Sequence, residues 1–256
     1  MTHPYFTKAR HPRVLAHRGL VTAEGEDSGI WENSAAAFAA AHAAGAEYVE
    51  TDCQVTADGD VVLFHDSTLE RLVGDTRAVR DVRTLELREI LSAHGGLLTV
   101  AEALDSFPDV RFNIDVKTPA AVEPLGPILV EHTHRVLVTS FSDASRRAAV
   151  SSVLRAGASL RPATSGGSRT IAGLRALSAL RLSSARVLQG IDALQIPERH
   201  GALTVLTPAL VRAAHRRGVE IHVWTVNDPA DMRRLVAAGV DGIVSDRSDV
   251  ALRTLS

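Results

Sequence analysis

The apolar run at residues 14–16 ends in His17, Arg18 and Gly19, three residue types that suit an anion site. An imidazole titrates near neutral pH and can transfer protons. A guanidinium binds phosphate through several hydrogen bonds, and glycine lets the backbone approach a ligand closely. A lone histidine at a strand end could simply be solvated, but the three together predict chemistry on an anion.

Residues 48–66, YVETDCQVTADGDVVLFHD, contain two acids and a second histidine. Side chains alternate along a strand, so Glu50 and Asp52 share one face. Asp58-Gly59 predicts a two-residue hairpin turn that sends DVVLF back as a second strand. In that register Asp52 lies directly opposite His65. A bulged or longer turn would shift the pairing by one residue.

The segment VRFNIDVK, residues 110–117, places Asp115 and Lys117 on a polar face. A parallel strand covered on both sides should be almost wholly apolar, because buried charges are costly unless they are paired or bind a metal. Such local violations of the folding pattern tend to mark functional sites. Glu50, Asp52 and Asp115 offer hard oxygen ligands, which suit Mg²⁺ or Ca²⁺ better than zinc.

Two cations accompany these acids. Arg18 and Lys117 supply positive charge suited to a phosphate group. His17 and His65 could transfer protons on either side of a reaction centre. Carboxylates, cations and histidines together point to phosphoryl chemistry. The alternative is that the acids and cations form structural ion pairs that need no metal.

The elements that must position these residues follow a βαβα pattern, in which short β-branched runs alternate with alanine- and leucine-rich helical segments. We expect strands at 13–18, 47–55, 110–117, 135–141, 158–163, 192–196, 220–226 and 241–245. About eight such units in a chain of this length predict an α/β fold of the (β/α)8 TIM barrel type, with its chemistry at the C-terminal strand ends. A doubly wound open sheet is the competing fold, although no G-x-G-x-x-G follows the first strand.

Helical segments at 33–45, 206–218 and 229–239 each end in a glycine suited to a left-handed C-cap. The charge-rich segment 66–98 breaks the βα rhythm and predicts a small insertion after the second strand. The stretch ATSGGSRT, residues 163–170, has the composition of a loop. We therefore expect a single domain over residues 1–256, with an insertion at roughly 66–98.

Composition limits the possible partners. The chain has 256 residues, 45% of them hydrophobic, which is enough for a sizeable core. A formal net charge of -2 gives no general attraction to nucleic acid or to anionic membranes. The single cysteine, Cys53, excludes an intrachain disulfide. The first 13 residues are polar, and no run of about 18 apolar residues follows. We expect a cytoplasmic protein without stable membrane association; its oligomeric state is left open.

Six motifs in this chain resemble those of the glycerophosphodiester phosphodiesterase family, in its soluble bacterial form. They are AHRG at 16–19, ENS at 32–34, VETDCQVTADGDVVLFHD at 49–66, NIDVK at 113–117, VWTVN at 223–227 and GIVSDRSD at 242–249. The family consists of metal-dependent (β/α)8-barrel hydrolases. The resemblance implies hydrolysis of a glycerophosphodiester, such as glycerophosphocholine or glycerophosphoethanolamine, to glycerol 3-phosphate and an alcohol.

The resemblance also implies roles for individual residues. His17 and His65 match the family's catalytic histidines, which act as general acid and base. Glu50 and Asp52 match its first two metal ligands. The third ligand position usually carries glutamate and is Asp115 here, one methylene shorter, so that the metal could be displaced or reached through a water.

The remaining matches concern substrate binding and support of the site. Arg18 and Lys117 match residues that hold phosphate charge, and Trp224 matches an aromatic residue that lines the substrate pocket. Glu32 and Asn33 belong to a motif that braces the first βα turn. The expected cofactor is a divalent metal, Mg²⁺ or Ca²⁺, and the expected partner is a small-molecule glycerophosphodiester.

Two other functions remain open at this point. A lysophospholipase D-like enzyme would keep the barrel and the metal but act on lysophospholipids. An apolar surface near the barrel mouth would favour this alternative. A non-catalytic barrel would bind glycerophosphodiesters tightly without turnover. The alcohol group preferred, the metal used and the direction of each proton transfer are not predicted from the sequence.

Overall fold

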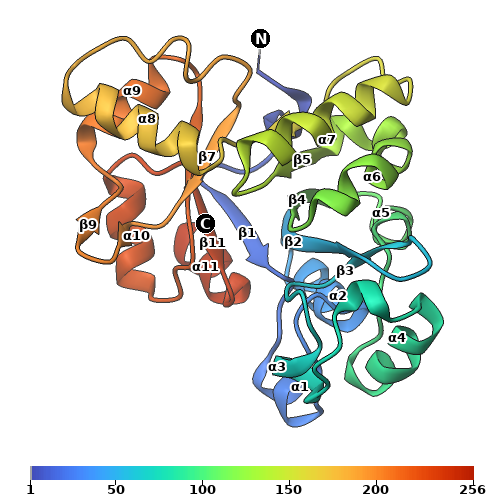
Figure 1. Ribbon diagram of the computed structural model, residues 1–256. Coiled ribbons are helices and arrows are strands. Elements are labelled where there is room, and N and C mark those ends of the chain that lie inside the picture. Colours follow the sequence, from blue (N-terminus) through green and yellow to red (C-terminus); the bar gives the residue numbers. More distant parts are fainter. Residues whose placement is uncertain (1) are drawn as a thin grey trace.

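The computed structural model describes residues 2–256 as a barrel of parallel strands surrounded by helices (Figure 1). The eight parallel strands are β1 (Arg13–His17), β2 (Tyr48–Val55), β4 (Arg111–Val116), β5 (Val136–Thr139), β6 (Ala163–Thr164), β7 (Ala193–Ile196), β10 (Glu220–Val223) and β11 (Gly242–Ser245). They pair in the order β6-β5-β4-β2-β1-β11-β10-β7. A parallel bridge between Ser165 and Ala193 joins the two ends. The expected (β/α)8 TIM barrel is therefore confirmed.

Helices follow most of the barrel strands. They are α1 (Ala23–Asp27), α2 (Ala35–Ala43), α3 (Glu70–Val73), α4 (Thr84–Leu91), α5 (Val100–Ser106), α6 (Val122–Leu129), α7 (Asp143–Arg155), α8 (Ser168–Ala179), α9 (Pro208–His215), α10 (Pro229–Ala237) and α11 (Ser248–Leu255). The predicted left-handed glycines after α2, α9 and α10 have φ of 90°, 69° and 93° and are confirmed. Three short strands complete the fold: β3 (Val61–Leu63), β8 (Arg199–His200) and β9 (Leu203–Thr204).

The β2–β3 hairpin has a different register from the predicted one. Val55 pairs with Val61, and the Phe64 amide donates to the Asp52 carbonyl at 3.0 Å. The loop has three residues, 57–59, because the Thr56 amide donates to the Asp60 carbonyl. Gly59, the last loop residue, has a left-handed backbone, as is common in three-residue hairpin loops. The two-residue turn was wrong, and His65 lies one position beyond the residue that faces Asp52.

The fifth strand and the segment after it also differ from expectation. β6 has two residues, Ala163–Thr164, and begins later than the predicted range 158–163. ATSGGSRT is not an exposed loop, since residues 163–167 are buried. The Asp143 carboxylate accepts hydrogen bonds from the amides of Gly167, Arg169 and Thr170, and from the Thr170 hydroxyl. These bonds fix the segment as the start of α8.

The N-terminal segment fills the end of the barrel where the strands begin. A single helical turn at Pro4–Phe6 buries Tyr5 and Phe6 against Leu15 and Tyr48 inside the barrel. The Arg13 guanidinium donates to the Phe6 carbonyl at 2.9 Å, which ties this turn to β1. The open mouth is therefore the opposite end, where the strands finish.

The segment 66–98 forms α3, α4 and single helical turns at Val79–Asp81 and Ser92–His94. Its apolar side chains pack with Val62 and Phe64 of the preceding strand region in one hydrophobic cluster, which also contains Leu69, Val79, Val82, Leu87, Leu91 and Leu97. In Figure 1, α1 and α3 lie together at the end toward which the β1 arrow points. The segment thus packs beside the barrel mouth rather than along the barrel wall.

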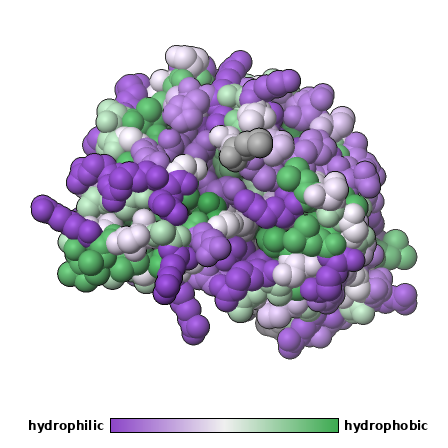
Figure 2. Space-filling model, turned by 90° about the horizontal axis from the view of Figure 1, so that it is seen from above, coloured by the Kyte–Doolittle hydropathy of each residue, from purple (hydrophilic) through white to green (hydrophobic). Residues whose placement is uncertain are grey.

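The surface shows mixed polarity. Figure 2, which views the molecule from above Figure 1, shows hydrophilic side chains over most of that face, interrupted by separate hydrophobic areas. Among residues 2–256, no helix is both long and apolar enough to cross a bilayer.

Replacement of Asp143 by alanine should lower the free energy of unfolding by about 2–3 kcal/mol, because several donors at the start of α8 lose their buried acceptor. Urea denaturation measures this loss. The hydrogen bonds that the Asp143 carboxylate accepts outweigh its burial and lower its pKa, so the stabilisation is present above pH 4 and declines as pH falls further. Asp228→Ala, at an exposed cap with two amide donors, is the control and should cost about 1 kcal/mol. Equal losses in the two variants would contradict this account.

Candidate functional site

Parallel pairing of the strands gathers the predicted site residues at the barrel mouth. His17 at the end of β1 pairs with Glu50 on β2, and Asp52 on β2 pairs with Asp115 on β4. Residues paired across neighbouring parallel strands direct their side chains to the same face. The two aspartates therefore stand side by side at the barrel mouth.

Lys117 lies between these aspartates. Its Nζ is 2.8 Å from Asp52 Oδ1 and 2.6 Å from Asp115 Oδ2. Arg18 Nε approaches Asp52 Oδ2 at 3.2 Å from the other side. Burial alone would raise the pKa of Asp52, but the Lys117 and Arg18 cations hold it below its usual range. Asp52 is therefore ionised at neutral pH.

The negative charges of Glu50 and Asp115 are less well balanced by nearby cations than that of Asp52. Burial, and repulsion from Asp52 and Asp115, raise the pKa of Glu50 well above its usual value. Burial also raises the pKa of Asp115. Glu50 Oε2 and Asp115 Oδ1 are buried and have no hydrogen-bond partner. Two unpartnered carboxylate oxygens beside an ionised aspartate form a donor set that suits a hard divalent cation.

The carboxylates do not form a ready-made metal site. Within residues 2–256, no three His, Cys, Asp or Glu side chains are arranged to hold an ion. Both oxygens of Asp52 are already engaged, Oδ1 by Lys117 and Oδ2 by Arg18 and the Asn33 amide. A divalent cation shared by all three acids would have to replace part of this internal positive charge.

His17 is held by the carboxylate of Asp246, which directly follows the last strand. Its Nδ1 lies 2.6 Å from Asp246 Oδ1, just beyond β11. Asn227 Nδ2 donates to the other Asp246 oxygen at 2.8 Å. The hydrogen bond from His17 lowers the pKa of Asp246, and an ionised carboxylate can only accept. His17 Nδ1 is therefore the donor, which leaves Nε2, 3.9 Å from Glu50 Oε2, for proton exchange.

His65 has a similar partner in the adjacent residue. Its Nδ1 lies 2.6 Å from Asp66 Oδ1, and Asp66 Oδ2 accepts from Arg71 Nε. Burial opposes ionisation of Asp66, but the hydrogen bonds from His65 and Arg71 lower its pKa. The same reasoning makes His65 Nδ1 a donor and leaves its Nε2 free. Each predicted catalytic histidine is thus oriented by a carboxylate.

The first βα turn is braced by the residues that the sequence singled out for this role. Glu32 Oε1 accepts from Arg18 Nη1 at 2.8 Å, and Asn33 Nδ2 donates to Asp52. Arg18 and Asn33 both have left-handed backbones, with φ of 58° and 57°, a conformation that costs energy and recurs at functional sites. The turn also requires Gly19, because a Cβ there would lie 2.8 Å from the Ala37 carbonyl carbon.

Trp224 lies just beyond the end of β10 and is half-buried. Its ring packs edge-on against Phe141, which follows β5, with 6.1 Å between ring centroids. The Phe141 ring is 61% exposed, and Lys117 Nζ lies 5.6 Å from its centroid. The two rings form an aromatic wall beside the cationic part of the site.

Five residues at the mouth were not chosen from the sequence: Asp66, Arg71, Phe141, Asn227 and Asp246. Asp66 could have been found, because it directly follows a predicted catalytic histidine. Asp246 could also have been found, because it follows the last barrel strand, where such folds place their chemistry. The ion pairs of Arg71 depend on how the segment 66–98 folds back, and no local pattern predicts that.

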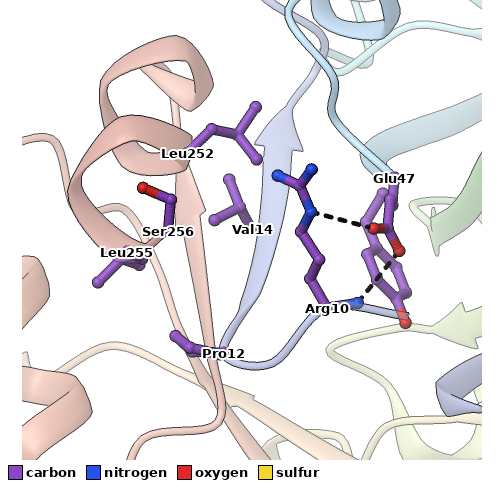
Figure 3. A pocket seen from close by; sticks show the side chains of 8 residues that line it. Arg10, Pro12, Val14, Glu47, Leu252, Leu255 and Ser256 are labelled. Atoms are coloured by element: carbon purple, nitrogen blue, oxygen red, sulfur yellow. Dashed lines mark hydrogen bonds and ion pairs between the residues drawn. The ribbon is translucent and has the colours of Figure 1, made fainter. Parts of the chain in front are cut away.

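A groove between α11 and the start of β1 lies away from these residues (Figure 3). Its lining includes Val14, Leu252 and Leu255, and the Arg10 side chain crosses it to reach Glu47, with Nε 3.6 Å from Oε1. Arg10 precedes β1 and Glu47 precedes β2. The groove therefore opens where the strands begin, at the end opposite the histidines.

Comparison with known proteins matches the chain to one family. Residues 16–250 match the model of the glycerophosphoryl diester phosphodiesterase family. A protein of Mycobacterium tuberculosis, named "Probable glycerophosphodiester phosphodiesterase 2", is 37% identical over 93% of this chain and 88% of its own. The glycerophosphodiester phosphodiesterase of Caldanaerobacter subterraneus is 29% identical over 91% of this chain and 93% of its own.

Solved structures agree with the fold. The glycerophosphodiester phosphodiesterase of Thermotoga maritima superposes with a TM-score of 0.70 at 24% identity, covering 96% of this chain and 99% of its own. A phosphodiesterase of Oleispira antarctica, solved with its product sn-glycerol-3-phosphate, has a TM-score of 0.70 at 19% identity and covers 95% of this chain and 96% of its own. At these identities the likeness concerns the barrel.

Removal of the Lys117 cation by Lys117→Met should lower the free energy of unfolding of the metal-free protein by about 3 kcal/mol, because it leaves buried carboxylates without a counter-charge. Urea denaturation in EDTA measures the change. The double variant Asp115→Asn/Lys117→Met should recover part of the lost free energy of unfolding, because one of the buried carboxylates without a counter-charge is then removed. A loss below about 1 kcal/mol in the single variant would mean that Lys117 does not neutralise the site.

The raised pKa of Glu50 gives a pH-dependent prediction. Above its unfolded value of 4.5 the folded protein retains a proton that the unfolded chain has released, so this group makes stability fall as pH rises. Glu50→Gln removes that decline, and in EDTA its stability relative to the unmodified protein should increase by at least about 1 kcal/mol from pH 5 to pH 8. The control Glu24→Gln, on exposed α1, should show no such trend; a flat difference for Glu50→Gln would refute the prediction.

Proposed function

Because this chain belongs to the glycerophosphoryl diester phosphodiesterase family, we propose that it hydrolyses glycerophosphodiesters such as glycerophosphocholine and glycerophosphoethanolamine to glycerol 3-phosphate and an alcohol. One observation carries the proposal: His17 and His65 are each oriented by a carboxylate at the mouth that also holds the acids and two cations. The product complex of the Oleispira antarctica enzyme supports a small-molecule substrate of this class.

The cations and the histidines have different roles in the proposed reaction. Lys117 and Arg18 neutralise the charge of the phosphodiester and the additional charge that develops as a nucleophile attacks phosphorus. One free Nε2 acts as a general base that takes the proton of the neighbouring glycerol hydroxyl as it attacks phosphorus, and the other acts as a general acid that protonates the departing alcohol. Water then opens the resulting cyclic phosphate to glycerol 3-phosphate, and the two histidines exchange roles as water loses a proton and the glycerol oxygen gains one. The Asp66 and Asp246 carboxylates hold the rings in the required tautomer and stabilise the protonated form.

We propose that Glu50, Asp52 and Asp115 hold a divalent metal, Mg²⁺ or Ca²⁺. The unpartnered oxygens of Glu50 and Asp115 and the ionised state of Asp52 support this assignment. When bound, such an ion polarises phosphoryl oxygens and stabilises the charge of the transition state. Asp115 would contribute its ligand oxygen from a position beside Asp52 on the neighbouring strand.

The aromatic wall of Trp224 and Phe141 supplies the apolar part of the substrate site. Carbon-bound hydrogens of the glycerol or of the alcohol would pack against these rings, while the phosphate faces Lys117. We therefore assign Trp224 to substrate binding, and Glu32 and Asn33 to support of Arg18 and Asp52.

Release of choline and glycerol 3-phosphate from glycerophosphocholine tests the proposed function. The protein with Mg²⁺ or Ca²⁺ should release both products, and EDTA should stop the reaction. His17→Ala and His65→Ala should each lower kcat/KM by at least about 100-fold, as expected for loss of a positioned acid or base.

His42→Ala, at an exposed position on α2, is the matched control and should retain full activity. Tight binding of glycerophosphocholine without turnover by the metal-loaded protein would contradict the proposal and favour a binding function. Release of choline from lysophosphatidylcholine but not from glycerophosphocholine would instead indicate a lysophospholipase D.

A further inference from the structure

The segment 66–98 contributes a charged side chain to the site. Arg71, on α3, donates from Nε to Asp66 and from Nη2 to Glu32. Asp66 holds the ring of His65, whereas Glu32 holds the guanidinium of Arg18. One guanidinium therefore joins two parts of the site that are distant in the sequence.

These contacts form a chain of alternating charge. It runs from Asp52 through Arg18, Glu32 and Arg71 to Asp66, and each link is an ion pair between adjacent members. The last member, Asp66, contacts His65. The chain of ion pairs therefore connects Asp52, which is paired with both Lys117 and Arg18, to His65. Without Arg71, Glu32 would keep only its bond from Arg18, and Asp66 only its bond from His65.

The segment that carries Arg71 is fixed against the first βα turn by contacts of a different kind. The rings of Trp31 and His94 are stacked, with 3.5 Å between centroids and an interplanar angle of 3°. His94 Nδ1 also lies 2.8 Å from the Gly29 carbonyl, and Ser34 forms an antiparallel bridge with Leu97. The segment 66–98 is therefore attached to the first βα turn by contacts that do not involve Arg71.

We infer that Arg71 is a positioning residue for the reaction: it fixes the orientation of His65 through Asp66 and that of Arg18 through Glu32. The inference rests on the proposed function for its catalytic meaning and on geometry for the positioning itself. A planar guanidinium can bind two carboxylates in fixed directions, which an ammonium cannot do. Arg71 acts through the carboxylates of Asp66 and Glu32, to which its guanidinium is bound.

A role in stability alone would require these ion pairs to hold the fold together. The Arg71 side chain is 49% exposed, and ion pairs of such exposure contribute little to stability because water screens them. Arg77 provides a comparison within the same segment. Its side chain is 46% exposed and pairs with two carboxylates, Asp75 and Glu86, but neither belongs to the site.

The test compares Arg71→Gln with Arg77→Gln in the full chain. Arg71→Gln should lower kcat for glycerophosphocholine by about 10- to 100-fold, less than removal of His65 itself, because a misplaced imidazole still transfers protons in part. Arg77→Gln should keep kcat within about twofold. The melting temperatures of both variants should change little and by similar amounts. Millimolar methylguanidinium should restore part of the kcat of Arg71→Ala. Arg71→Lys should have a lower kcat than the unmodified protein, because an ammonium does not fix the directions of both carboxylates.

A readout independent of activity is the Nδ1 proton of His65, observed by NMR in protein labelled with ¹⁵N-histidine and assigned with His65→Gln. The signal should be present in the unmodified protein and in Arg77→Gln, and should shift or broaden in Arg71→Gln. An unchanged signal, or equal losses of kcat in the two variants, would overturn the inference. If the unmodified protein has no phosphodiesterase activity, the proposed function fails, and the NMR signal alone still decides whether Arg71 positions His65.

Discussion

Three carboxylates on two neighbouring strands cannot share a buried barrel mouth unless positive charge accompanies them. In this protein the compensating charge comes from Lys117, two residues beyond Asp115 on the same chain segment, and from Arg18 at the first strand end. The compensation is incomplete, because Glu50 and Asp115 keep unpartnered oxygens. The mouth therefore keeps buried negative charge that the side chains around it do not fully balance.

The other parts of the structure follow from this requirement. Arg18 reaches Asp52 from a left-handed backbone position, which the Asn33 and Gly19 conformations make possible. The two histidines flank the charged group, and each donates its Nδ1 proton to an aspartate so that Nε2 remains free. One of these aspartates directly follows the last strand, and the other begins the segment 66–98. A site of this kind thus needs the closed barrel, in which the first and last strands are neighbours.

The sequence predicted most of the architecture, because periodicity, glycine C-caps and strand-like runs are local signals. Polar residues on strand faces also identified Glu50, Asp52 and Asp115, since they violate the pattern expected of a buried strand. The register of the β2–β3 hairpin was wrong because it depends on whether the loop has two or three residues. The fifth strand was misplaced because its neighbouring glycines, which resemble a loop, are buried against Asp143. Arg71 could not be found, because its two partners become its neighbours only in the folded chain.

The central claim is that the phosphate of the substrate lies between His17 and His65, beside Lys117, at the C-terminal end of the barrel. A crystal structure of the protein with glycerol 3-phosphate and Mg²⁺ tests this claim most directly. The account predicts a phosphate group within hydrogen-bond distance of both imidazoles and of Lys117, with the glycerol against the ring of Trp224. A product molecule bound elsewhere, for example in the groove beside Leu252, with the mouth free of phosphate, would contradict it.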